Sequence, residues 1–307
     1  MRIFVTGASG WIGSAVVPEL IDAGHQVVGL ARSDSSAAAL TEAGADVVRG
    51  TVDDLDVLRD AAAASDGVIH LAFKHDLAFT GDFQGAAEAD RRAVDTFGDA
   101  LAGTGRPFVL ASGVAGLAPG RVATERDVPT IDGSPASMRG ATAQAVIAMA
   151  SRGIRSSVVR LSPTCHGEGD NGFMAALVAT ARTQGTSGYV GDGANRWPAV
   201  HRLDAARLFR LAAEKAPAGS VLHGVAEEGV ALRDIAEVIG RRLGIPVASV
   251  PPADAAEHFS WLSAFVGLDA PASHTLTGEL LDWRPTGPGL LEDLEKGHYF
   301  DVPTTAA

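Results

Sequence analysis

Three glycines at regular spacing stand near the start of the chain. Gly7, Gly10 and Gly13 follow the apolar run Ile3–Val5 and lead into a helical pattern from Trp11 to Ala23. A strand, a glycine-rich turn and a helix start together present backbone N–H groups and the positive end of the helix to an anion. This spacing is typical of loops that bind the pyrophosphate of a dinucleotide. We expect cofactor contacts from Gly7, Ser9, Gly10, Trp11, Ile12 and Gly13.

A basic residue follows the second strand candidate, at the place where a dinucleotide-binding fold contacts the adenosine ribose. The apolar run Gln26–Leu30 is followed by Ala31, Arg32 and Ser33. An acidic side chain here would accept hydrogen bonds from the ribose 2′-OH and favour NAD. Arg32 instead offers a cation to a 2′-phosphate, and Ser33 offers a hydroxyl. The alternative for Arg32 is a solvated surface arginine. We therefore expect the cofactor to be NADP(H).

Apolar runs and helical patterns alternate through the first half of the chain. Strands are expected at 26–30, 46–49, 67–71, 107–111 and 156–161, with helices at 35–43, up to about 64, 83–102 and 137–152. Such alternation predicts an α/β fold of the Rossmann type, a doubly wound parallel sheet with helices on both faces. After residue 167 the pattern loosens into helices at 171–184, 203–214 and 232–243, a strand at 221–225 and an aromatic-containing helical segment.

The expected strands end at residues that can contact a ligand. Gly7, Arg32, Ala72 and Ser112 each stand at the carboxyl end of a strand. In open α/β sheets ligands bind beyond these ends, so the four residues should converge on one site. Leu71, Ala72 and Lys74 complete the expected cofactor contacts.

Composition limits the remaining function classes. The chain has 307 residues, 46% of them hydrophobic, with 37 acidic and 25 basic residues and a formal charge of −12. This balance argues against a nucleic-acid or membrane partner. The single cysteine, Cys165, suits a reducing cytoplasm, and no apolar run approaches the length of a membrane span. Nine histidines without close paired spacing give no zinc motif, so no metal is expected.

Four segments together resemble the extended short-chain dehydrogenase/reductases, which include the NAD-dependent epimerase/dehydratase-like enzymes. They are TGASGWIG from Thr6, VIHLA from Val68, RLSPTCHG from Arg160 and AVHRLDAARL from Ala199. The resemblance implies a Rossmann core at residues 1–165. It also implies a smaller, mostly helical substrate-binding lobe at 166–307, with about 199–225 returning to the core. The family commonly forms homodimers through the two long helices, here 83–102 and 137–152.

The chain departs from this family at its catalytic pair. The family carries a Tyr with a Lys four residues later, in the helix after the fifth strand. Aligning that helix puts Arg139 near the Tyr site and Ala143 near the Lys site. The only tyrosines are Tyr189 and Tyr299, and neither has a Lys four residues later. The usual proton donor is therefore absent.

Other residues remain available for chemistry. Ser112 stands at the family's Ser position and can hydrogen-bond a carbonyl oxygen, while Arg139 can stabilise a developing oxyanion but is a poor proton donor. Each catalytic role has a purely structural alternative. Ser112 could instead hydrogen-bond the local backbone at the end of its strand, and Arg139 could be a surface arginine on a helix. The resemblance also implies a substrate pocket, for which we expect His75, Thr164, His166, Trp197 and His201. Among these, the histidines titrate near neutral pH.

These residues predict an atypical NADPH-dependent oxidoreductase. Its small-molecule substrate would be a carbonyl or imine compound that is fairly apolar. An imine can already be protonated when it binds, so its reduction depends less on a proton donor in the enzyme. One alternative is a non-catalytic NADP-binding protein, such as a redox sensor. A further alternative is a nucleotide-sugar epimerase or dehydratase, which is disfavoured because those enzymes also need the missing Tyr.

Overall fold

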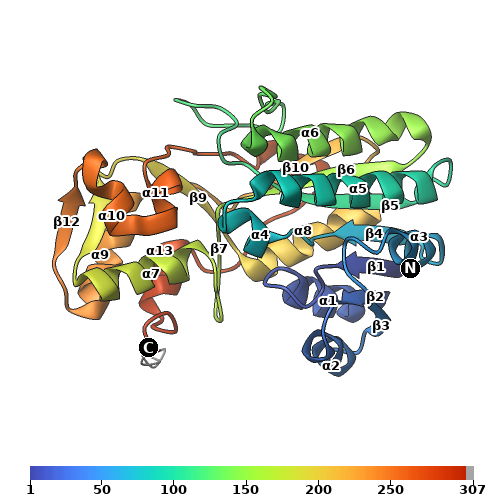
Figure 1. Cartoon of the computed structure of the whole chain (residues 1–307), viewed down its shortest axis with the longest axis horizontal. Coiled ribbons are helices and arrows are strands. Elements are labelled where there is room, and N and C mark those ends of the chain that lie inside the picture. Colours follow the sequence, from blue (N-terminus) through green and yellow to red (C-terminus); the bar gives the residue numbers. More distant parts are fainter. Residues whose placement is uncertain (302–307) are drawn as a thin grey trace.

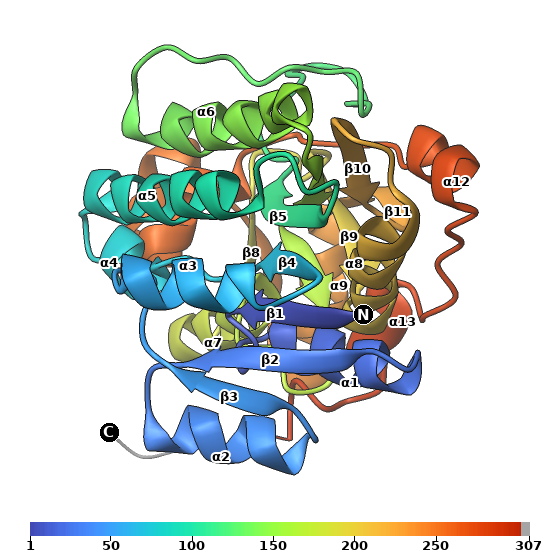
Figure 2. The ribbon, with the colours of Figure 1, turned by 90° about the vertical axis from the view of Figure 1, so that its right-hand side faces the viewer.

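A seven-stranded parallel sheet forms the centre of the larger part of the molecule (Figure 1 and Figure 2). The structure, a computed structural model, describes residues 1–301, apart from the side chains of 79, 135 and 136. The strand order is β10-β6-β5-β4-β1-β2-β3. The bounds are β1 Arg2–Thr6, β2 Gln26–Ala31, β3 Asp46–Arg49, β4 Gly67–His70, β5 Pro107–Gly113, β6 Arg155–Leu161 and β10 Ser220–Gly224. The predicted Rossmann-type α/β fold is confirmed.

Helices cover both faces of this sheet, as Figure 2 shows in end view. One hydrophobic cluster joins the sheet to α1 (Gly13–Asp22), α2 (Asp34–Glu42) and α8 (Arg202–Lys215). A second cluster joins the opposite face to α3 (Leu55–Ala63), α5 (Phe83–Leu101) and α6 (Pro135–Ala148). The short α4 (His75–Phe79) follows β4, and the single-turn η1 (Met149–Arg152) continues α6. Because the strands are buried on both faces, they form the continuous apolar runs seen in the sequence.

A smaller lobe has its own hydrophobic cluster and lies at the left of Figure 1. Its strands form a three-stranded sheet, β11-β9-β7, and a two-stranded sheet, β12-β8. They are β7 Thr164–His166, β8 Ser187–Val190, β9 Arg196–His201, β11 Glu227–Ala231 and β12 Val247–Val250. The helices of this half of the chain are α7 Phe173–Gln184, α9 Leu232–Leu243, η2 Pro252–Asp254, α10 Ala255–Phe259, η3 Ser260–Leu262, α11 Ser263–Val266, α12 Thr275–Leu281 and α13 Leu290–Glu295.

Local signals explain where several helices begin and end. The Ser33 hydroxyl accepts a hydrogen bond from the Ser36 amide and caps α2, and Ser134 caps α6 in the same way. Helix α9 ends at Gly244, whose φ of 66° is left-handed. These signals are local in sequence, which is why the expected helix bounds agree with the structure to within about two residues.

The later part of the chain crosses between the lobe and the sheet. Helix α8 packs on α1, and β10 pairs with β6 at the edge of the large sheet. Trp283, which the aromatic pattern assigned to the helical lobe, is buried with the sheet's core instead, and its indole donates to the Asp204 carbonyl at 3.1 Å. The five short lobe strands were not predicted, because runs of three to six residues carry little periodicity. No helix within residues 1–301 combines the length and the apolar composition needed to cross a bilayer.

Candidate functional site

The glycine-rich loop between β1 and α1 is closely packed on one side and open on the other. Gly7 has a φ of 65°, and a Cβ there would lie 2.7 Å from the Ala72 nitrogen. A Cβ at Gly13 would lie 2.1 Å from the Gly7 carbonyl oxygen. A Cβ at Gly10 would meet only that oxygen, at 3.2 Å, and Gly10 is exposed. The backbone geometry therefore gives the three glycines different roles: Gly7 forms a tight turn, Gly10 leaves an open approach, and Gly13 allows a close contact with the helix.

Backbone donors on this loop are available to an anion. The Gly10 amide donates to the Gly7 carbonyl at 3.0 Å, and the Ser14 amide donates to the Gly10 carbonyl at 2.8 Å. Within residues 1–301 the amides of Ser9, Trp11 and Ile12 donate to no carbonyl or side chain. These N–H groups precede the first turn of α1, which contains no acidic side chain. The loop therefore has the donor set that a pyrophosphate requires.

Trp11 connects the loop to the segment after β6. Its indole Nε1 donates to the Cys165 carbonyl at 2.9 Å, and the Arg202 guanidinium stacks over its ring at 4.2 Å. Burial raises the pKa of the Cys165 thiol, which keeps it protonated and unsuited to act as a nucleophile. Trp11 thus connects the glycine-rich loop to the segment after β6 and to the start of α8.

Two arginines lie where β2 and β3 end, at the place where contacts to the adenosine ribose were expected. Arg32 follows β2, is largely exposed, and lies 3.5 Å from a carboxylate oxygen of Asp76. Arg49, at the end of the neighbouring β3, donates to the Ser33 carbonyl at 2.5 Å and to Asp34 at 2.7 Å. Sequence reasoning did not include Arg49, although the last residue of the strand beside β2 was the available signal. The Ser33 hydroxyl is partly engaged in capping α2.

Residues after β4 lie beside the glycine-rich loop, at the same edge of the sheet. The Ala72 amide donates to the Thr6 hydroxyl at 3.3 Å, so the ends of β4 and β1 are in contact. The Lys74 ammonium binds Asp53 at 2.5 Å. Asp53 lies in the segment after β3. Lys74 therefore links the loops after β3 and β4.

Arg139 is part of a cluster beside the end of β5. Its guanidinium lies 4.0 Å over the Phe73 ring, and it donates to the Ala111 carbonyl at 3.4 Å. The His75 ring contacts the same Phe73 ring, with 5.0 Å between centroids. Desolvation lowers the pKa of Arg139, and the Asp90 carboxylate opposes this effect. Arg139 is half-buried and directed toward β5, so it is not the surface arginine considered as its alternative.

Ser112 lies next to the carbonyl that Arg139 contacts. It is half-buried near the end of β5, in register with Arg160 of β6. Sequence reasoning missed Phe73 and Asp90 in this cluster. Asp90 is 5% exposed and lies 3.3 Å from His70 inside the core. An aspartate on the apolar face of a helix was the available signal for it.

Four of the side chains expected in the substrate pocket lie elsewhere. Thr164, His166 and Trp197 are each 1% exposed. The Thr164 hydroxyl donates to the Pro198 carbonyl at 2.5 Å, His166 Nδ1 pairs with Asp293 at 3.0 Å, and Trp197 lies in the lobe core. His201 caps α8 through its Nδ1. Thr164 and His166 are directed into the protein interior because β7 pairs with β9, and Trp197 is buried where β9 pairs with β11. Of the five, only His75 lies in the Arg139 cluster.

Neither Tyr189 nor Tyr299 replaces the catalytic tyrosine that this chain lacks. The Tyr299 hydroxyl donates to Asp170 at 2.9 Å, and burial raises the pKa of Tyr299 far above its usual range. Tyr189 lies in the lobe under Arg233. In the described part of the chain, no three His, Cys, Asp or Glu side chains gather in a way that would hold a metal ion. Arg139 and His75 both contact the Phe73 ring, and Arg139 reaches the backbone carbonyl that directly precedes Ser112 on β5.

Comparison with known proteins gives consistent results. A model of the NAD dependent epimerase/dehydratase family matches residues 3–223. An uncharacterized protein of Schizosaccharomyces pombe is 47% identical over 302 residues, covering 98% of this chain and 100% of that protein. The 4-hydroxy-2-methyl-3-oxo-4-farnesyl-3,4-dihydroquinoline-1-oxide ketoreductase of Stigmatella aurantiaca is 29% identical over 289 residues, covering 89% of this chain and 84% of that protein. MoeE5 in complex with UDP-glucose and NAD shares the fold, with a TM-score of 0.76, 22% identity and 97% of each chain covered.

Proposed function

Because this chain belongs to the NAD-dependent epimerase/dehydratase family, we propose that it is an NADPH-dependent oxidoreductase that reduces a carbonyl or imine of a small, fairly apolar molecule. The observation that carries this proposal is the contact of Arg139 with the Ala111 carbonyl, directly before Ser112, on a sheet whose strands also lead into the glycine loop. The named ketoreductase among the relatives supports carbonyl reduction on an apolar compound.

The glycine loop fits a dinucleotide. The amides of Ser9, Trp11 and Ile12 would bind the pyrophosphate, and the exposed Gly10 leaves room for its approach. Arg32 and Arg49 support the preference for NADP(H), because both place a guanidinium at the end of β2 or β3 where a 2′-phosphate would lie. Lys74 and Asp53 would border the adenosine.

Arg32→Ala should lower the affinity for NADPH about tenfold or more, because it removes a charge-assisted contact to the 2′-phosphate. The affinity for NADH, which has no 2′-phosphate, should change little. Titration of both cofactors into both proteins, followed by nicotinamide fluorescence, measures the two effects. Glu42→Ala, at the other end of α2, is the control. A wild-type preference for NADH would contradict the assignment.

The reaction follows from the groups at the end of β5. The hydride would come from a reduced nicotinamide held by the glycine loop. In the proposed arrangement the Ser112 hydroxyl donates a hydrogen bond to the carbonyl oxygen, and the Arg139 guanidinium stabilises the negative charge that develops there. In the reduction direction the protonated His75 ring would transfer its proton to the product oxygen and become neutral. Desolvation, with Arg139 nearby, lowers the pKa of His75, which makes the protonated ring a stronger acid and lets the neutral ring accept the proton in the reverse direction.

The test is a screen of ketones, aldehydes and imines with purified protein and NADPH, followed by loss of nicotinamide absorbance. Turnover of at least one uncharged carbonyl or imine compound supports the proposal. Tight NADPH binding without turnover of any compound would favour the alternative of a non-catalytic NADP-binding protein, which the missing Tyr and Lys motivate. Turnover of a nucleotide sugar instead would place the protein with the epimerases.

The proposed location is the cytoplasm.

We also propose a homodimer that forms through α5 and α6, which lie side by side in Figure 2. On α6, Ala143 and Val146 face inward and are buried, whereas Ala141 and Ala145 are half-buried and Ala148 is exposed. This spacing puts the last three on one helix face, where small side chains permit close packing with a second copy.

Ala145→Arg should therefore convert the dimer to a monomer, because a long charged side chain would prevent this packing. Light scattering at micromolar concentration gives the mass of each protein. Ala38→Arg, on the exposed face of α2, serves as the control and should remain dimeric. A wild-type protein that is monomeric under these conditions would contradict the proposal.

A further inference from the structure

A cavity of about 290 Å³ lies beside the end of β5. One wall is the segment 114–123, which begins directly after β5, and the other is the segment 267–271. Backbone hydrogen bonds hold the two walls together, from the Ala123 amide to the Pro271 carbonyl and from the Ser273 amide to the Ala123 carbonyl, both 2.8 Å. The Val114 amide donates to the Leu161 carbonyl at 3.1 Å, which fixes the first wall to β6. The cavity is thus a built feature whose first wall follows β5, the strand that carries Ser112.

The lining is almost entirely apolar. It includes Val114, Leu117, Ala118, Ala123, Leu268 and Ala270, with glycines and prolines between them. The buried side chains of Val225 and Ala272 join Val114, Ala118 and Ala123 in the hydrophobic cluster behind the first wall. The volume is near the lower end of the roughly 300–1,000 Å³ that ligand pockets occupy. An occupant would therefore be small and apolar.

Asp269 is the one charged residue among those that line this cavity, and its carboxylate is already engaged. It accepts hydrogen bonds from the Arg196 amide at 2.7 Å, from Nε at 3.0 Å and from a terminal nitrogen at 2.9 Å. Arg121, next to the lining residue Gly120, is held by Asp127. Both arginines close to the cavity are therefore neutralised by carboxylates, and neither is available to an anionic ligand in this arrangement.

Resting on the proposed function, we propose that this cavity receives the uncharged, apolar part of the carbonyl or imine substrate, and that Asp269 excludes anionic substrates by holding Arg196. A phosphate or carboxylate on the substrate would have to compete with Asp269 for the guanidinium. Removal of the Asp269 charge would release Arg196 to bind such a group.

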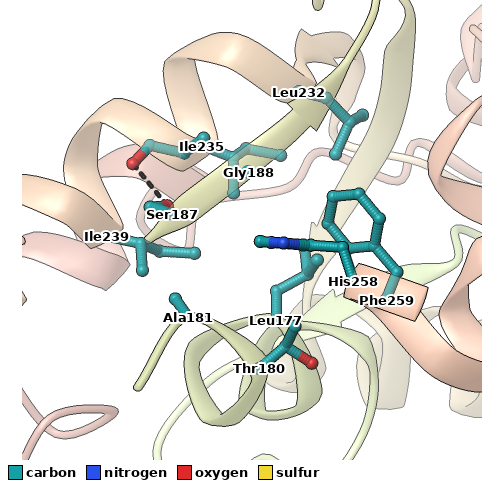
Figure 3. A pocket seen from close by; sticks show the side chains of 11 residues that line it. Leu177, Thr180, Ala181, Ser187, Gly188, Leu232, Ile235, Ile239, His258 and Phe259 are labelled. Atoms are coloured by element: carbon teal, nitrogen blue, oxygen red, sulfur yellow. Dashed lines mark hydrogen bonds between the residues drawn. The ribbon is translucent and has the colours of Figure 1, made fainter. Parts of the chain in front are cut away.

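A smaller cavity in the lobe serves as a contrast. It has a volume of about 10 Å³ and is lined by residues that include Leu177, Ile235, Ile239, His258 and Phe259 (Figure 3). The Ser187 hydroxyl beside it donates to the Ala236 carbonyl at 2.8 Å. A space of this size accommodates at most about one water molecule. It is not a substrate site.

The test compares two ketones of the same skeleton, 4′-methylacetophenone and 4-acetylbenzoate, which differ in a methyl and a carboxylate group. Calorimetry measures the binding of each to the whole protein with and without NADP⁺. The wild type should bind the neutral ketone and not the carboxylate. Ala270→Phe should lower the affinity for the neutral ketone about tenfold or more, because the phenyl ring fills the cavity. Ala115→Phe, in the same loop but outside the lining, should leave it unchanged.

Asp269→Asn should raise the affinity for 4-acetylbenzoate about tenfold or more, since a charge-assisted pair with Arg196 becomes available. Adding Arg196→Met should remove that gain. Thermal melting checks that each variant folds, and Leu268→Trp, at an exposed position of the rim, replaces Ala270→Phe if that variant does not fold.

The outcomes separate this inference from the proposed function. Unchanged affinity for the neutral ketone in a folded cavity-filling variant, or no gain for the carboxylate in Asp269→Asn, would overturn the inference even if ketones are reduced. Binding as expected, without NADPH consumption for any carbonyl or imine compound, would overturn the proposed function and leave the assignment of the cavity standing.

Discussion

Turnover of a ketone with NADPH should fall by about 10²- to 10³-fold when Ser112 is changed to Ala, because the reaction loses a preorganised hydrogen-bond donor at the carbonyl oxygen. NADPH affinity should stay near the wild-type value, since Ser112 does not belong to the glycine loop. Ser112→Thr keeps a hydroxyl at the same position and should restore part of the rate. Single-turnover absorbance measurements report the chemical step directly.

Arg139 provides the second arm of this prediction. Arg139→Met keeps much of the side-chain length over Phe73 but removes the charge, and it should lower kcat by about tenfold or more. Arg139→Lys should retain part of the activity. If neither Ser112→Ala nor Arg139→Met changes the rate in folded protein, the reaction does not occur at the end of β5, and the NADP-binding alternative becomes the better account.

A lysine introduced at position 143 would be buried in the hydrophobic core. Ala143, at the position of the family's Lys, is 1% exposed and packs in the core with Phe97 and Phe108. A lysine there would place an ammonium among apolar side chains, and its pKa would fall with burial. The absence of Lys at this position is thus consistent with the way α6 packs in this chain.

Gly13→Ala should lower the affinity for NADPH by about 100-fold or more, because it weakens several charge-assisted hydrogen bonds to the pyrophosphate, each worth about 1.5–3 kcal/mol. The new Cβ would lie 2.1 Å from the Gly7 carbonyl oxygen and 2.6 Å from the Ala8 carbonyl oxygen, so the loop backbone must move. That movement displaces the amides of Ser9, Trp11 and Ile12 from the position of the pyrophosphate. Titration by nicotinamide fluorescence measures the loss.

Gly24→Ala, at the opposite end of α1, is the matched control. Its φ of 83° is left-handed, and a Cβ there would have no neighbour within 4 Å, so the substitution should cost about 1 kcal/mol of stability through the backbone alone. It should lower the melting temperature without altering cofactor affinity. If Gly13→Ala bound NADPH as tightly as Gly24→Ala, the glycine loop would not be the pyrophosphate site.

Much of the fold could be predicted because its signals are local. The strand β3, Asp46–Arg49, and the helix α9, Leu232–Leu243, have the predicted bounds, since apolar periodicity and capping residues act within a few positions. The glycine spacing likewise indicated a loop whose geometry the structure shows at Gly7 and Gly13. The sequence also showed directly that no Tyr–Lys pair is present in α6.

Other features depend on which segments pair in space. The position of Thr164, His166 and Trp197 followed from the pairing of β7 with β9 and from a lobe core that draws on segments far apart in the chain. The link between Asp269 and Arg196 spans 73 positions, and no local pattern indicates it. Arg139 likewise acquired its neighbours Phe73 and Ala111 only when α6 packed on β5 and β6. The sequence by itself determined the elements and the cofactor loop, because those depend on neighbouring residues. Tertiary packing decided which polar side chains face the site and which face the core.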